Sequence, residues 1–200
     1  MSSRMSVDGR AKGFFRFIAV FLGMLGAIWL IVAWSGSASD PQTEADAAME
    51  EPIAPLPLAS AENPAKAALG ERLFGDVRLS RDRSMSCLTC HQFDRGGADG
   101  LPVARRSDGT SLARNSPTIF NVGINYFYNW DGSTQALEAH AEKLMLNPDV
   151  MDANWPELLE RLKADSSYPS AFKALYPDGL TKASVLDALA TYERSLVTPN

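Results

Sequence analysis

The segment Cys87-Leu88-Thr89-Cys90-His91 carries the side chains of this chain most able to do chemistry. Two thiols three positions apart, followed at once by an imidazole, form the attachment pattern of c-type haem: the thiols add to the haem vinyl groups and the histidine becomes an axial ligand of the iron. One helical turn would place both sulfurs along one haem edge and leave the histidine pointing at the iron. The pattern therefore predicts one covalently attached c-type haem, held by Cys87, Cys90 and His91.

Two other chemistries use paired cysteines. A thioredoxin-like redox pair belongs in a βαβ context, and a structural zinc site needs a second pair of Cys or His ligands. The sequence shows neither, and Cys87 and Cys90 are its only cysteines. Haem attachment is therefore the favoured interpretation, and only a disulfide between the same two thiols competes with it.

Helices must position this segment, because the sequence from residue 64 onward shows helical spacing and no convincing strand or repeat. Ser86 is a candidate cap for the haem-attachment turn, and residues 94–118, which lack apolar periodicity, form a long loop expected to lie over the haem. Five further helices are predicted. The first runs from Asn63-Pro64 to Gly75 and the second from Ser133 or Thr134 to Leu146. The third starts at Asn154 with Glu157 in a capping-box-like pattern, the fourth contains Phe172, Leu175 and Tyr176, and the fifth starts at Thr181. The fold class is all-α.

The first 63 residues divide into three segments of different character. Residues 1–13 are basic, residues 14–34 are apolar enough to span most of a bilayer, and residues 35–63 are a flexible linker of Pro, Ala and acidic residues. The positive-inside rule then places the N-terminus in the cytoplasm and the haem domain, residues 64–200, on the periplasmic side of the bacterial inner membrane. A cleaved signal peptide, which would leave a soluble periplasmic protein, is the alternative. The net charge of −5 argues against nucleic acid as a partner.

Two groups of side chains after the long loop are candidates for the haem pocket. Tyr126, Phe127, Tyr128 and Trp130 form an aromatic cluster that would supply pocket wall and core, and a role in electron transfer is the alternative for Trp130. His140 falls on the apolar stripe of the predicted helix that ends at Leu146. It is either a residue acting beside the haem or a buried histidine with an ordinary hydrogen-bond partner.

Several further segments accompany the haem motif in a fixed order: LGERLF, RLS with SCLTCH, GG with LP, NSPT, NWDG, the NP of LMLNP, ERLKAD and YERSLVTPN. With these markers, the chain from Leu69 to Asn200 resembles the bacterial dihaem cytochrome c peroxidase family, which includes the methylamine-utilisation haem enzymes. That family is built from two cytochrome c-like domains, each with its own CXXCH. This chain matches the N-terminal domain and stops near the family's interdomain junction.

The resemblance implies a role for each matching residue. The N-terminal haem of the family reacts with peroxide, so Cys87 and Cys90 would be its thioether links and His91 its proximal ligand. Trp130 matches a tryptophan that lies between the two haems, and Asn115 matches a residue that contributes to an interface calcium site. Electrons would come from a small cytochrome or cupredoxin through a second haem domain, here on another chain or in a homodimer.

The sequence departs from the family on the distal side of the haem. The loop after the haem motif lacks the histidine that often serves as a displaceable sixth ligand. Val150 stands where an acid is expected, with Asp149 just before it, and His140 replaces a glutamine. Peroxide must lose a proton from its bound oxygen and regain it on the departing one, which needs a distal acid or imidazole. We therefore assign that role to His140, with Asp149 as the second choice.

Three functions are consistent with these features. The first is a membrane-tethered cytochrome c peroxidase-like enzyme that reduces hydrogen peroxide to water, although relatives of the family also oxidise other substrates. The second is a single-haem electron carrier, in which Met145 or Met151 would be the sixth ligand. The third is a truncated, non-catalytic product of a dihaem gene, with an exposed apolar surface where the missing domain would dock.

Overall fold

The computed structural model describes Leu56 and residues 63–198. The predicted basic segment, the predicted membrane segment and all but two residues of the predicted linker lie outside this range. Among the described residues, none of the helices has the length and apolar character needed to cross a membrane. The same residues contain no strand, only three isolated antiparallel bridges. The prediction of an all-α fold is thereby confirmed for this part of the chain.

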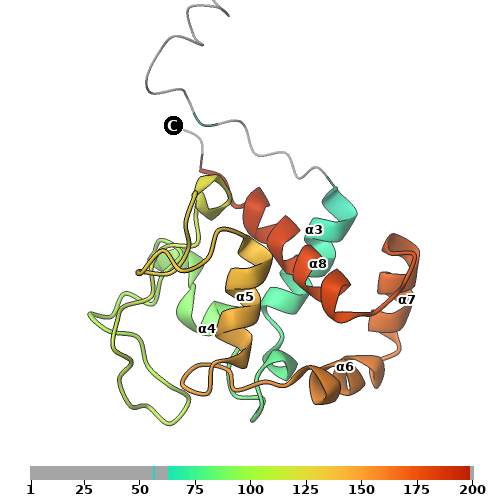
Figure 1. Cartoon of the computed structure of the whole chain (residues 1–200), viewed down its shortest axis with the longest axis horizontal. Coiled ribbons are helices and arrows are strands. Elements are labelled where there is room, and N and C mark those ends of the chain that lie inside the picture. The colour runs from blue at the N-terminus through green and yellow to red at the C-terminus, as the bar shows by residue number, and fades with distance from the viewer. Residues whose placement is uncertain (1–55, 57–62, 199–200) are drawn as a thin grey trace, which may run out of the picture. The chain divides into compact units, whose positions relative to one another are not determined.

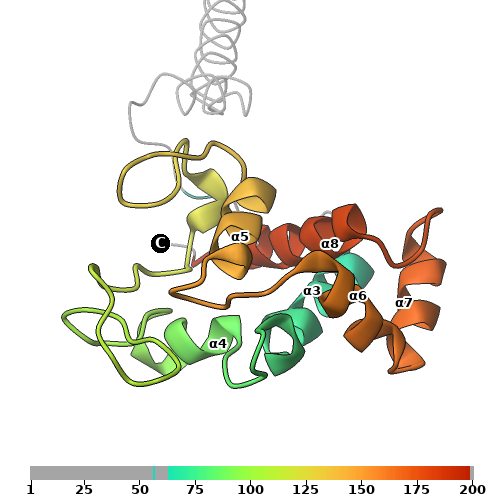
Figure 2. The ribbon, with the colours of Figure 1, turned by 60° about the horizontal axis from the view of Figure 1, so that its bottom comes forward.

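Six α-helices and three short 3₁₀ helices make up the described residues (Figure 1). In chain order they are α3 (Pro64–Phe74), η1 (Val77–Leu79), α4 (Cys87–Cys90), η2 (Phe93–Arg95), η3 (Val122–Ile124), α5 (Leu137–Leu146), α6 (Trp155–Lys163), α7 (Ser167–Leu175) and α8 (Lys182–Ser195). The long loop predicted for residues 94–118 corresponds to the segment between η2 and η3. In Figures 1 and 2, α3 and α8 lie between α4 and α7, and Figure 2 shows α4 and α5 separated from each other.

Three helix starts follow the capping signals in the sequence. The side-chain oxygen of Asn63 accepts a hydrogen bond from the third residue of α3, and Asn154 does the same for α6 with the amide of Glu157, each at 3.0 Å. Thr181 begins α8 in a capping box with Ser184. Each cap satisfies backbone donors that the first helical turn leaves without partners. These three starts are confirmed.

The predicted start of α5 is wrong by about one turn. Neither Ser133 nor Thr134 caps the helix, which begins at Leu137 after Ala136. The reason is that both hydroxyls already accept hydrogen bonds from the side chain of Asn129, at 3.0 and 3.1 Å, and the Thr134 carbonyl pairs with a backbone amide across the turn. Residues committed to closing a turn cannot also cap the next helix.

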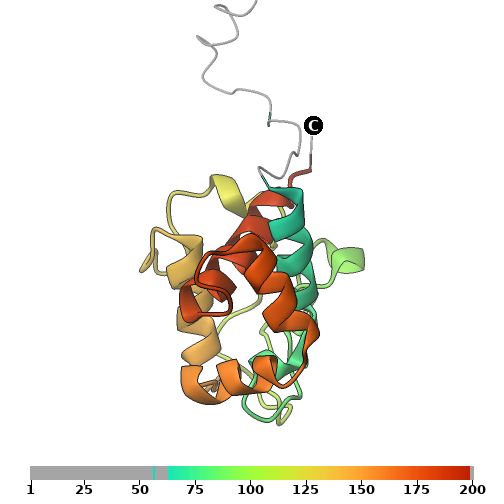
Figure 3. The same cartoon turned by 90° about the vertical axis from the view of Figure 1, so that its right-hand side faces the viewer.

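The hydrophobic core centres on the crossing of α3 and α8, which lie side by side in Figure 3, and α5 flanks α8. Leu73 and Leu189 lie almost completely buried at this crossing. The two backbones approach closely at Gly70, where a Cβ atom would lie only 2.0 Å from the carbonyl oxygen of Ala188. A glycine on α3 therefore permits the close contact, and the helix pair provides a rigid base for the haem-attachment segment.

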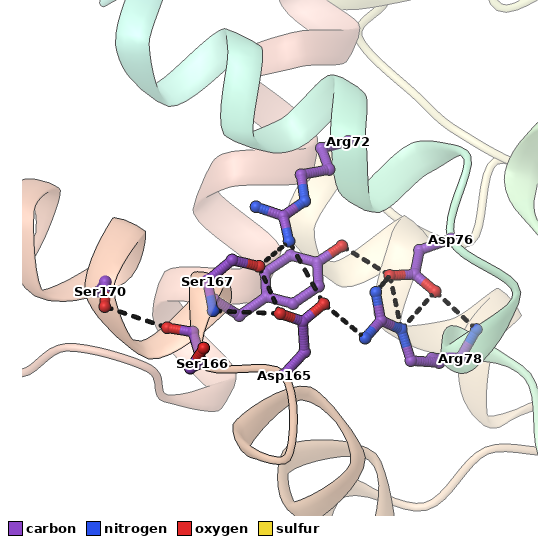
Figure 4. Close-up of polar contacts among 8 residues, drawn as sticks. Arg72, Asp76, Arg78, Asp165, Ser166, Ser167 and Ser170 are labelled. Carbon is purple, nitrogen blue, oxygen red and sulfur yellow. Dashed lines mark hydrogen bonds and ion pairs between the residues drawn. The ribbon is translucent and has the colours of Figure 1, made fainter.

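A network of charged side chains ties α3 and η1 to the start of α7 (Figure 4). Asp76 accepts hydrogen bonds from Arg78 and, at 2.6 Å, from the buried hydroxyl of Tyr168. Arg78 also binds Asp165 at 2.9 Å, and Arg72 lies within 3.5 Å of the same carboxylate. Burial alone would raise the pKa of Asp76, but the hydrogen bonds from Arg78 and Tyr168 hold it below its usual value. The network fixes the chain just before it enters the segment that leads to α4.

Candidate functional site

The two cysteines lie at the ends of a single helical turn. Ser86 is the N-cap of α4, and its backbone amide donates to the Thr89 hydroxyl at 3.0 Å, so the predicted cap position is confirmed. Both thiols are free and half-buried. Burial raises the pKa of each thiol, and the nearby Glu193 raises that of Cys87 further. Residues three apart on a helix share a face, so both sulfurs can bond to one edge of a flat ligand.

His91 follows α4 directly and its ring is held in one orientation. The backbone amide of His91 donates to the Cys87 carbonyl at 3.0 Å. Its Nδ1 lies 3.1 Å from the carbonyl oxygen of Gly97, which can only accept, so the ring proton is on Nδ1. Burial lowers the pKa of His91, which keeps the ring neutral. The free lone pair on Nε2 is what a metal ligand needs, and this arrangement fits the proximal ligand of a covalently attached haem.

The backbone around Gly97 explains why that residue is a glycine. Gly97 has φ +74°, a left-handed conformation that disfavours side chains, and a Cβ atom there would approach Ile119 to 3.0 Å. The hydroxyl of Ser116 donates to the Cys90 carbonyl at 2.8 Å from the same side. The carbonyl that orients His91 is therefore fixed by the fold.

His140 lies on α5, and its side chain is half-buried. Its Nδ1 is 2.9 Å from the side-chain oxygen of Asn129, and its ring stacks on the buried ring of Tyr128 at a centroid distance of 5.6 Å. Burial lowers the pKa of His140 to about 4, and the positive charge of Lys143 lowers it further. His140 is thus a neutral imidazole with its own ordered partner.

The prediction that the aromatic cluster supplies core is wrong for three of its four members, and its role as haem-pocket wall stays a prediction. Tyr128 is buried, but Tyr126, Phe127 and Trp130 are exposed, with 86%, 58% and 57% of their surface accessible. Asn129 and Gly132, in the same segment, have left-handed backbone conformations. Trp130 donates its indole N–H to the Asn115 carbonyl at 3.1 Å. It belongs to an exposed apolar surface.

The remaining sequence candidates lie away from the two histidines or in the core. Asp149 is an exposed residue whose carboxylate forms an ion pair with Arg106 at 3.0 Å. Met145 and Met151 are both buried in the hydrophobic core. The Asn115 side chain is exposed, and the described residues contain no group of three or more His, Cys, Asp or Glu able to hold a metal ion. A calcium site at Asn115 stays a prediction.

Sequence reasoning missed two residues of the site, Asn129 and Glu193. Glu193 on α8 is only 5% exposed, and within the described residues its Oε2 atom has no hydrogen-bond partner. Burial raises its pKa to about 8. Its position could have been found, because it continues the helical spacing of Leu186, Leu189 and Ala190. Nothing in the sequence pairs Asn129 with His140, eleven positions away.

Comparison with protein families gives a match over the whole helical region. The family model described as di-haem cytochrome c peroxidase matches residues 64–200. Cytochrome c peroxidase Ccp of Escherichia coli K12 is 34% identical over 151 residues, which are 75% of this chain and 32% of that protein. Methylamine utilization protein MauG of Methylorubrum extorquens is 34% identical over 194 residues, 90% of this chain and 54% of that protein.

Solved structures show the same fold. A MauG-like protein associated with microbial copper homeostasis superimposes with a TM-score of 0.64 and 29% identity, covering 74% of this chain and 46% of that one. The diheme peroxidase BthA of Burkholderia thailandensis matches with a TM-score of 0.55 at 24% identity, which supports the fold alone. The chain thus spans between about a third and a half of the length of these relatives.

Proposed function

Because the chain belongs to the di-haem cytochrome c peroxidase family, we propose that its helical domain is the part of a peroxidase that reduces hydrogen peroxide to water on a c-type haem. One observation carries the proposal. Two half-buried histidines each have Nδ1 within hydrogen-bond distance of a carbonyl oxygen, His91 at Gly97 and His140 at the side chain of Asn129. One ring is suited to bind the iron, and the other to move a proton on the opposite side.

The residues that would hold the haem are those of the attachment turn. Cys87 and Cys90 would form the thioether links, and Nε2 of His91 would be the axial ligand. Covalent attachment requires both thiols on one face beside the ligand histidine, which α4 provides. When bound, the haem supplies an open iron position for peroxide and the electrons that break the O–O bond.

His140 would act as the distal acid and base. Reduction of one peroxide takes up two electrons and two protons and releases two waters, so a proton must move from the bound oxygen to the departing one. The neutral ring of His140 can accept that proton on Nε2 and return it, which is the step that general acid–base catalysis accelerates. Asp149 is the weaker candidate because its carboxylate is held by Arg106 at an exposed position.

Electrons would enter at the exposed apolar surface formed by Ile124, Tyr126, Phe127 and Trp130. Large exposed apolar side chains that lie together commonly mark a protein–protein contact, and these four fall within seven residues of the chain. We propose that a second haem domain docks there, on another chain or in a homodimer, and receives electrons from a small cytochrome or cupredoxin. We also propose a location on the periplasmic side of the bacterial inner membrane, supported by the apolar sequence of residues 14–34 and the basic residues before it.

The first experiment is a spectroscopic titration of the ferric, haem-loaded protein with stoichiometric hydrogen peroxide. A high-spin spectrum that changes on addition of peroxide is expected, and replacing His140 with Ala should slow this reaction by about a hundredfold or more. A low-spin spectrum with a His–Met charge-transfer band, indifferent to peroxide, would instead identify an electron carrier with Met145 or Met151 as ligand. An unchanged rate in His140→Ala would remove the distal role of this residue.

A further inference from the structure

We infer that Asn129 is a positioning residue for peroxide reduction: it holds His140 in the tautomer that leaves Nε2 free to accept a proton. This inference rests on the proposed function, in which His140 is the distal acid and base. Its first support is the distance of 2.9 Å between Nδ1 of His140 and Oδ1 of Asn129. An amide oxygen only accepts hydrogen bonds, so the ring must carry its proton on Nδ1.

The orientation of the Asn129 amide is itself determined by its neighbours. Its Nδ2 group donates to the hydroxyls of Ser133 and Thr134 at 3.0 and 3.1 Å. Lys143 also donates to the Ser133 hydroxyl, whose oxygen has two lone pairs and so accepts from both groups. With both amide protons used on this side, the oxygen is the atom that faces His140. In this orientation each of the three contacts of the amide pairs a donor with an acceptor.

The backbone at Asn129 aims its side chain at α5. Asn129 has φ +64°, and asparagine is among the few residues with a side chain that adopt this left-handed conformation readily. The turn is closed by the amide of Gly132, which donates to the Asn129 carbonyl at 3.1 Å. The turn therefore presents a side-chain acceptor at a fixed place without help from the rest of the loop.

The other contacts of His140 leave Nε2 available. The ring of Tyr128 stacks on the imidazole and fixes its plane. Among the residues that the structure describes, no hydrogen bond is made to Nε2. The charged or titratable groups that act on the ring are His91, from the end of α4, and Lys143, one turn further along α5. Neither accepts a proton from Nδ1, so Asn129 alone selects the tautomer.

Three variants of the haem-loaded full chain test the inference. Asn129→Gly removes the acceptor and tolerates the left-handed backbone. Asn129→Asp keeps an acceptor oxygen and adds a negative charge beside the ring. Asn121→Gly is the matched control, because Asn121 is also left-handed, at φ 60°, but its side chain binds Thr198. His140→Ala provides the reference for complete loss of the distal imidazole.

Two readouts are measured across pH: the rate of reaction with peroxide, and the rate at which cyanide associates with the ferric haem. Hydrogen cyanide enters as the neutral acid and binds the iron as the anion, so its proton must pass to a nearby base. Cyanide binding therefore reports on the base without requiring catalytic turnover. Asn129→Gly should slow both rates by about tenfold or more, as loss of a supporting partner commonly does. Asn129→Asp should retain fast association and move the acid midpoint of the cyanide profile upward by about one pH unit or more.

The controls separate this inference from the proposed function. If His140→Ala slows both reactions while Asn129→Gly leaves the rates and the pH profile unchanged, Asn129 has only a structural role and the inference is wrong. An unshifted cyanide profile in Asn129→Asp would have the same meaning, even if Asn129→Gly folds poorly. If His140→Ala itself changes neither rate, the proposed distal role is lost, and the inference with it. Asn121→Gly should match the unsubstituted protein in both readouts.

Discussion

The buried carboxyl of Glu193 should make the protein less stable as pH rises through neutrality. It lies on the inner face of α8, and its Oε2 atom has no hydrogen-bond partner within the described part of the chain. Glutamine has nearly the shape of a protonated glutamate but cannot ionise. Replacing Glu193 with Gln should therefore leave the packing intact and remove the effect of pH.

The sign and the size of this pH effect follow from the pKa values of the Glu193 carboxyl in the unfolded and in the folded protein. The usual pKa of a glutamate is 4.5, and burial raises that of Glu193 to about 8. Between these values the folded protein keeps a proton that the unfolded chain releases, so the free energy of unfolding falls as pH rises and levels off above about pH 8. At about 1.36 kcal/mol per pH unit, the loss by pH 7 is at most about 3 kcal/mol.

Urea unfolding of the haem-loaded protein at pH 5, 6, 7 and 8, followed by circular dichroism, would test this. The variant and the unsubstituted protein should have similar free energies of unfolding at pH 5, and the variant should be increasingly more stable towards pH 8. Taking the difference between the two cancels the titration of His91 and His140. Glu160→Gln, at an exposed ion pair with Lys163, is the control and should follow the unsubstituted protein. Parallel curves for Glu193→Gln and the unsubstituted protein would refute the reasoning.

Two further substitutions test the packing of α3 against α8 and the charged network at the start of α7. Gly70→Ala should lower the free energy of unfolding by about 2 kcal/mol or more, because the new Cβ would meet the Ala188 backbone. Gly75→Ala, whose Cβ would meet only the end of a flexible leucine, is its control in thermal unfolding. Tyr168→Phe should cost about 1–2 kcal/mol by removing the hydrogen bond to Asp76. Equal urea midpoints for Tyr168→Phe and the unsubstituted protein would show that Arg78 alone satisfies that carboxylate.

The helix boundaries that sequence could predict are those set by local chemistry. Asn63, Asn154 and Thr181 cap the residues immediately after them, so a stretch of four residues contains the whole signal. The start of α5 could not be read in this way. Ser133 and Thr134 have the right side chains for a cap, but the turn at Asn129 already uses their hydroxyls. A capping signal fails where a neighbouring turn competes for the same oxygen.

In the candidate site too, the parts set by local sequence could be predicted and the parts set by distant segments could not. The haem motif is complete in five consecutive residues. Gly97, whose carbonyl oxygen contacts the ring of His91, follows that histidine by only six residues. The distal side depends on how a loop folds back on α5, which no spacing rule describes. Tyr126, Phe127 and Trp130 are exposed, although their apolar character predicted that they would lie in the core.

The two histidines also differ in how freely their surroundings can change. His91 is oriented by a backbone carbonyl, which no substitution at Gly97 can remove, so its role is tied to the fold. His140 is oriented by a side chain, which can be replaced without altering the backbone. The family resemblance implies a glutamine at position 140 and an acid at position 150, and this chain has neither. If His140 carries out the proton transfer as proposed, the contact with Asn129 would fix the tautomer that this step uses. The two departures from the family are therefore compatible with retained chemistry because of a third residue that the motif does not contain.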